Sequence, residues 1–183
     1  LRNGLKVTDW NAIGTDWNER ETADAMRELL PEWGFPTNSS IKLLSLSENA
    51  VFLVECPLDN KKLVLRAHFQ GYNTQAEIDA ELIWLCAIIA ETDLETVKPV
   101  PTLRGVLRNT LPDGRSIVGF KYIDGVLLEP GDDLRPTMEK LGAMTAKLHL
   151  HSKTWCPPKG FQRKSWDFEN CLGEDAIFGD WRK

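Results

Sequence analysis

The chain has 183 residues, of which 42% are hydrophobic and 27% charged, and it carries a net charge of -5 with an isoelectric point near 5.3. This composition indicates a globular protein of one domain or one and a half, and the scattered lysines and arginines argue against a nucleic-acid partner. No apolar run reaches about 18 residues, and the first residues lack the charged-then-apolar pattern of a signal peptide, so we expect no membrane partner and no export.

The cysteines also indicate a compartment. There are four of them, none arranged as C-x-x-C: Cys56, Cys86, Cys156 and Cys171. Such spacing does not predict a disulfide framework, and Cys86 falls within an apolar helical pattern. We therefore expect reduced thiols and a cytoplasmic protein.

Residues 1–20 follow no period, whereas residues 21–30 have helical spacing that Pro31 ends. The next segments predict three successive antiparallel strands, over residues 41–46, 50–56 and 63–69. Ser47, Glu48 and Asn49 form the turn between the first two.

Arg66 stands in the middle of the third apolar strand. An arginine keeps its charge, and leaving a buried charge unpaired costs several kcal/mol, about 3 to 5 when a partner is removed. The following helix offers carboxylates, because a capping box at Thr74 and Glu77 begins an amphipathic pattern, and Glu81 lies one turn further on. Kinases hold their phosphate-gripping cation in this way. The spacing alone, however, favours a partly exposed arginine beside a solvated helix.

The second half of the chain predicts two more strands and another helix. The strands are expected over residues 102–108 and 116–123, the helix over 136–151, and loops or aperiodic sequence after it. A glycine-containing polar link follows Gly125, so we expect a boundary there, with one unit over residues 1–125 and a second over 126–183.

Two further patterns are weaker. His149, His151 and Cys156 resemble a metal cluster, but zinc sites need three or four ligands in a fitting geometry, so we assign no metal ligand. Seven tryptophans are more typical of a packed core and an interface than of a stacking platform.

Taken in order, the segments SENAVFLVE (47–55), LVLRAHFQGYNTQAEIDAELIWL (63–85), GFKYIDG (119–125), LGAMTAKLHLHS (141–152) and GFQRKSWDFENCLG (160–173) closely resemble the aminoglycoside phosphotransferase and choline kinase-like family. They look most like its homoserine kinase type II and stress-response kinase branch. The resemblance covers roughly residues 21–175. It implies an α+β fold: a kinase-like amino-terminal lobe with a five-stranded antiparallel sheet and one main helix, followed by the first helix of a truncated helical lobe.

The resemblance also implies roles for individual residues. Arg66 takes the place of the phosphate-gripping lysine, with Glu81 rather than Glu77 as its carboxylate. The loop of Ser47, Glu48 and Asn49 would cover the nucleotide, although it has no glycine. The hinge lies at Lys121 and Ile123, whose backbone would meet the adenine edge, with Phe120 as the back wall of the pocket.

The family's catalytic H-x-D-x-x-x-x-N segment does not occur in this sequence, and Gly179 and Asp180 are too near Lys183 to begin it. We therefore assign no catalytic base, and we expect no phosphoryl transfer by residues 1–183. The resemblance implies the nucleotide-binding half of a phosphotransferase that uses ATP, or alternatively GTP, and Mg²⁺ to phosphorylate a small hydroxylated substrate. The alternatives are a regulatory nucleotide-binding module and a Ser/Thr protein kinase.

Overall fold

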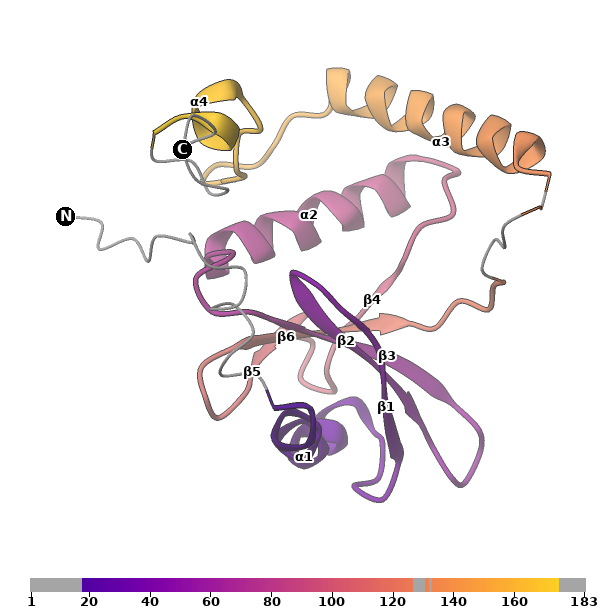
Figure 1. The fold of residues 1–183 in the computed structure, drawn as a ribbon, viewed down its shortest axis with the longest axis vertical. Coiled ribbons are helices and arrows are strands. Elements are labelled where there is room, and N and C mark those ends of the chain that lie inside the picture. The colour runs from indigo at the N-terminus through magenta and orange to yellow at the C-terminus, as the bar shows by residue number, and fades with distance from the viewer. Residues whose placement is uncertain (1–17, 127–130, 132, 175–183) are drawn as a thin grey trace.

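The computed structural model describes residues 18–126, 131 and 133–174, so the lead-in over residues 1–17 and the pair Gly179 and Asp180 lie outside the described residues. The described residues form an α+β fold with one antiparallel sheet (Figure 1). Its strands are β1 (Ser40–Leu46), β2 (Asn49–Glu55), β3 (Lys62–His68), β4 (Pro99–Val100), β5 (Arg108–Thr110) and β6 (Ser116–Lys121). The helices are α1 (Glu19–Leu29), the short 3-10 helix η1 (Leu30–Trp33), α2 (Gln75–Glu91), α3 (Arg135–Thr154) and α4 (Phe168–Leu172).

The strand order is β1-β2-β3-β6-β4, with β5 also paired to β6. Val100 pairs with Gly119 and Arg108 pairs with the next residue, Val118, so β4 and β5 lie in line along one edge of β6. The predicted five-stranded sheet therefore has an interrupted edge strand and counts six strands within the described part of the chain.

The strand predicted over residues 102–108 is wrong. The Thr102 N–H donates to the Val106 carbonyl over 2.8 Å and the Gly105 N–H to the Thr102 carbonyl over 2.8 Å, which closes a tight loop. Because this loop satisfies its own backbone groups, only the residues on either side of it pair with β6.

Side-chain alternation in β3 directs the two faces of the sheet to different helices. Leu63, Leu65 and Ala67 join the core beneath α1, together with Phe52, Met26 and other buried residues. Val64 packs on the opposite face against Ile78 and Leu82 of α2. Figure 1 shows the resulting layers, with α1 on one side of the sheet and α2 on the other. Arg66 shares the face of Val64, so its side chain is directed toward α2.

The start of α2 follows the predicted capping box. The Thr74 hydroxyl accepts from the Glu77 N–H over 3.2 Å, and the Glu77 carboxylate accepts from the Thr74 N–H over 2.8 Å. These bonds satisfy backbone donors that no helical carbonyl could reach. The box therefore sets where α2 begins, and with it the position of Glu81.

Helix α3 lies on the far side of α2 from the sheet (Figure 1). Polar contacts hold it there: Lys147 forms an ion pair with Asp93 over 2.7 Å, and Nε2 of His151 lies 3.1 Å from Oε2 of Glu91. The contact with α2 buries little of the apolar surface of α3. Those that stay exposed include Met138, Leu141, Met144 and Leu150.

We expect residues 1–183 to self-associate through this exposed stripe of α3, because contiguous exposed apolar patches of several hundred Å² are typical of interfaces. Light scattering across a concentration series should show a mass above that of the monomer. The variant Leu141→Glu/Met144→Glu should shift the distribution toward the monomer. A monomer at high concentration for the unmodified chain would contradict this prediction.

Candidate functional site

Arg66 and Glu81 form an ion pair between β3 and α2. Nη2 of Arg66 donates to Oε1 of Glu81 over 2.8 Å, and the two side chains are only 19% and 28% exposed. The guanidinium carbon lies 4.8 Å from the centre of the Phe120 ring, a distance at which a cation is attracted to the ring face. Glu81, one turn after the capping residue Glu77, is the carboxylate that pairs with Arg66.

The pair leaves part of the guanidinium without a partner. Arg66 Nε is buried and has no hydrogen-bond partner among the described residues. A buried donor in that condition costs about 1–3 kcal/mol, more in a charged group, so it is a position where an anionic acceptor would be stabilising.

The segment after α3 brings two further cationic side chains, Arg163 and Lys164, into contact with Glu81 and Tyr72 respectively. Nη1 of Arg163 lies 3.9 Å from Oε2 of Glu81, so Glu81 faces two guanidinium groups. The Lys164 ammonium donates to the Tyr72 carbonyl and lies 4.5 Å from the Tyr72 ring centre. Burial lowers the pKa of Lys164, with Glu77 opposing and Arg163 adding to the effect. Nothing in the local pattern of this loop predicted these contacts, because they join residues about 80 or more positions apart.

The turn between β1 and β2 contains Ser47 and Glu48, both exposed, and it leads into Asn49 at the start of β2. The Ser47 N–H donates to the Asn49 carbonyl over 3.1 Å, and hydrogen bonds from the Ser47 side chain and the Glu48 backbone lower the pKa of Glu48. Val51 lies opposite Arg66 in the sheet and Asn49 opposite His68. Glu48 of the turn is therefore three residues from Val51, the position opposite Arg66, and the role of the turn as a nucleotide-covering loop stays a prediction.

The predicted hinge lies where β6 ends, at its last residue Lys121 and at Ile123 beyond it. Phe120 is buried against α2, whereas Ile123 is 57% exposed in the irregular segment that follows. The Lys121 N–H is bonded to the Lys98 carbonyl over 2.8 Å. Phe120 thus has the buried position expected of a back wall, and adenine binding at Lys121 and Ile123 stays a prediction.

His68 was not singled out from the sequence, yet it is only 3% exposed. Burial, together with the nearby Arg66 and Arg108 guanidinium groups, lowers the pKa of His68 to about 3. Arg108 itself is bound by Asp79 of α2 through two hydrogen bonds of 2.7 and 3.0 Å. The His68 imidazole is therefore neutral at physiological pH.

The neutral His68 should make the free energy of unfolding depend on pH. An unfolded histidine titrates near 6.5, so between pH 3 and 6.5 the unfolded chain binds more protons than the folded one, and stability rises with pH through this window. Between pH 7 and pH 5 we expect the unmodified chain to lose about 2 kcal/mol from this group. Urea unfolding at the two pH values should show a smaller loss in His68→Phe. The exposed His149→Phe is the control, and equal losses in both variants would contradict the prediction.

His149, His151 and Cys156 do not form a metal centre in the structure. His151 is buried, pairs with Glu91 and stacks on Trp155 with 6.1 Å between ring centres. Within the described ranges, no group of three or more His, Cys, Asp or Glu side chains is placed to hold a metal ion. Among the same residues, no helix combines the length and apolarity needed to cross a membrane.

The sheet, the covering helix and a strand cation paired with a helix carboxylate are together the arrangement that kinases use to hold phosphates. The solved structure described as the microcompartment-associated aminopropanol kinase is similar to this chain, with a TM-score of 0.74 and 36% sequence identity over 86% of this chain and 49% of that one. The chain thus spans about half the length of that kinase. No protein-family model matches the chain, and no curated protein matches it. The similarity is consistent with a kinase type of phosphotransferase.

Proposed function

We propose that this chain is the ATP-binding half of a small-molecule phosphotransferase that moves the γ-phosphoryl group of the nucleotide to a substrate hydroxyl. The observation that carries the proposal is the Arg66–Glu81 pair, 2.8 Å long, with the Nε donor of Arg66 buried and unpartnered among the described residues. Glu81 orients the guanidinium, and the remaining N–H donors of Arg66 would donate hydrogen bonds to phosphate oxygens.

The surroundings of Arg66 suit this role. A guanidinium presents several donors in a fixed plane, so it can bind a phosphate through two hydrogen bonds while Glu81 keeps another. Phe120 supports the plane from one side. The turn of Ser47, Glu48 and Asn49 would close over the phosphates, and the segment of Lys121 and Ile123 would meet the base, whether adenine or, in GTP, guanine.

Magnesium would neutralise charge on the transferred phosphoryl group in such a reaction. The described residues offer no group of three side chains that would hold it, so we assign no step of the reaction to a metal ion held by them. What these residues do is bind the nucleotide and fix the direction of its phosphates.

The acceptor is proposed from the similarity to the aminopropanol kinase. Its name describes a small molecule with an amine and a hydroxyl, a combination that homoserine and aminoglycosides share, and choline has a hydroxyl with a quaternary ammonium group. We therefore propose a hydroxylated amine as the acceptor class for the complete site, in a phosphotransferase of the aminoglycoside phosphotransferase and choline kinase-like kind. We also propose that residues 1–125 and 126–183 are its two units and that the protein is cytoplasmic.

Calorimetric titration of residues 1–183 with ATP, GTP and adenosine tests the proposal, alongside an assay of ADP release with hydroxylated amines. We expect ATP to bind, and no turnover, because the chain has no H-x-D-x-x-x-x-N segment to position the acceptor. Absence of nucleotide binding would overturn the proposal. Turnover by a sample free of any longer enzyme would show that the catalytic groups lie within these residues.

A further inference from the structure

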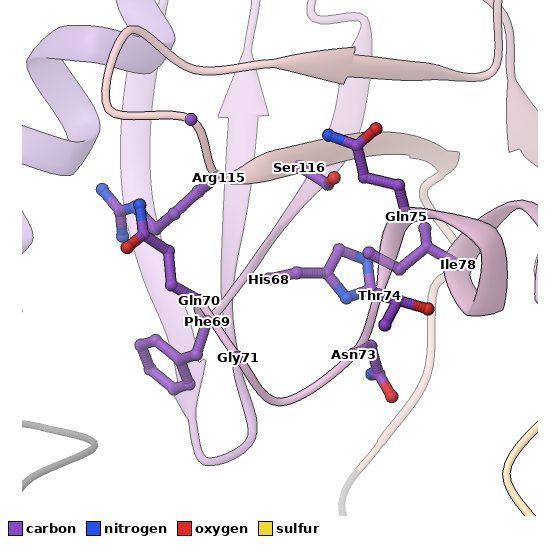
Figure 2. Close-up of a pocket in the computed structure, with 11 residues that line it drawn as sticks. His68, Phe69, Gln70, Gly71, Asn73, Thr74, Gln75, Ile78, Arg115 and Ser116 are labelled. Carbon is purple, nitrogen blue, oxygen red and sulfur yellow. The ribbon is translucent and has the colours of Figure 1, made fainter. Parts of the chain in front are cut away.

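A pocket of about 330 Å³ lies at the end of β3 (Figure 2). Residues 68–71 form one wall, residues 73–75 with Ile78 of α2 form another, and residues 114–116 close it. Neither Arg66 nor Glu81 lines it. We call it the His68 pocket, and its volume is at the lower end of the range for small-molecule sites, roughly 300–1,000 Å³.

His68 is the unusual group in this pocket. Figure 2 shows its ring directed from the end of β3 toward the first turn of α2, beside Thr74 and Ile78. The side chain is buried, and neither Nδ1 nor Nε2 has a hydrogen-bond partner in the part of the chain that the structure describes. Buried polar atoms are nearly always partnered, so two on one ring indicate a missing ligand.

The charges around the pocket favour an anion. Arg66 and Arg108 are the charged groups that act on His68, and the amino-terminal end of α2, with its partial positive charge, opens on the pocket. Arg115 also lines it, although its guanidinium binds Asp113 and the Thr22 hydroxyl.

The nearby carboxylates are already paired, although Glu77 lies in the first turn of α2 and offsets part of the positive charge at that helix end. Glu77 is bound within the capping box, Asp79 holds Arg108, and Asp113 holds Arg115. None of the residues that line the pocket is Asp or Glu. The chain as a whole has a net charge of -5, so a pocket without a lining carboxylate differs from the rest of the molecule. The lack of a lining carboxylate disfavours an ammonium ligand.

We propose that the His68 pocket binds a small phosphate-type oxyanion, free or as the phosphate end of a small organic molecule. A neutral imidazole has one N–H donor and one acceptor nitrogen that point to different sides of the ring, so one phosphate-type anion engages one of them: an anionic oxygen accepts from the N–H, or the O–H of a singly protonated phosphate donates to the acceptor nitrogen. The buried Ser116 hydroxyl lines the same pocket. The remaining volume accommodates a short organic substituent.

The chain has three histidines, so their ring resonances in NMR spectra report the site directly. Residues 1–183 are titrated with inorganic phosphate, with glycerol 3-phosphate and with ethanolamine, at a constant ionic strength set by sodium chloride. We expect saturable shifts of the His68 ring with one or both phosphates, and none at His149 and His151. Saturation by inorganic phosphate indicates a free anion as the ligand, and at least tenfold tighter binding of the ester indicates an organic phosphate.

A second measurement uses variants. Phosphate should raise the melting temperature of the unmodified chain and of the exposed control His149→Phe, but not that of His68→Phe or Ser116→Val. Because Arg66 is intact in all four proteins, a loss confined to the two pocket variants separates this pocket from the proposed nucleotide site. If either pocket variant fails to fold, the NMR titration of the unmodified chain still tests whether the His68 pocket binds phosphate. Equal shifts at all three histidines, no shift of His68 at tens of millimolar of either inorganic phosphate or glycerol 3-phosphate, or saturation by ethanolamine alone would overturn the proposal.

Discussion

Replacing Arg66 by alanine should weaken ATP binding by about 10- to 100-fold and leave adenosine binding nearly unchanged. Hydrogen bonds to charged groups contribute about 1.5–3 kcal/mol each, and adenosine keeps the base contacts but has no phosphates for the guanidinium to bind. Calorimetric titration of both ligands gives the ratio of affinities. This ratio separates phosphate binding from a general loss of stability.

Variants of the two candidate carboxylates, Glu81 and Glu77, test the same prediction further. Glu81→Ala should act in the same direction but less, because it removes the group that orients Arg66, and the double variant should lose less than the sum of the single losses. Glu77→Ala breaks the capping box, so it should lower the melting temperature without changing the ratio.

Arg108→Ala is the matched control, since Arg108 also joins the sheet to α2 through a carboxylate, Asp79. It should lower stability and leave the ratio of ATP to adenosine affinity unchanged. An unchanged ratio in Arg66→Ala as well would mean that Arg66 is a structural ion-pair partner, and the main physical support for a phosphate site would be lost.

Gly119→Ala should destabilise the fold by about 2–4 kcal/mol. Gly119 is buried in β6 between Leu65 and Val100, and a Cβ atom there would stand 2.7 Å from Nε1 of Trp33. That indole N–H donates to the Val100 carbonyl over 3.0 Å, so the ring cannot move away without losing the bond. Overpacking costs typically 1–3 kcal/mol and the lost bond about 1 more.

Gly142→Ala is the control for this change, because Gly142 lies in α3 and an added Cβ would meet nothing within 4 Å beyond its chain neighbours and the helix's own backbone. Alanine should there stabilise the helix by up to about 1 kcal/mol. Urea unfolding of the two variants measures both effects. Equal stability of Gly119→Ala and the unmodified chain would show that η1 and its tryptophan shift freely.

Local patterns were enough to predict the elements with strong periods. Apolar runs placed β1, β2, β3 and β6 to within two residues, because alternating burial on a sheet requires alternating side chains. The first turn of α2 could be predicted equally well, since the side chains of Thr74 and Glu77, three residues apart, each accept a hydrogen bond from the other's backbone N–H. Strands of two or three residues have no readable period, and for this reason β4 was not predicted and the strand predicted over residues 102–108 shares only Arg108 with β5.

The sequence by itself determined that a permanent charge at Arg66 enters an apolar strand and that a helix with two candidate carboxylates follows it. The tertiary structure decided the rest. Packing of α2 across the sheet brings Glu81 to Arg66, the chain after α3 brings Arg163 to Glu81, and the crossing of β3 with the start of α2 buries His68. These contacts join residues from 15 to 82 positions apart or arise from burial by several segments, so no local pattern encodes them, and only the folded chain brings their charges together.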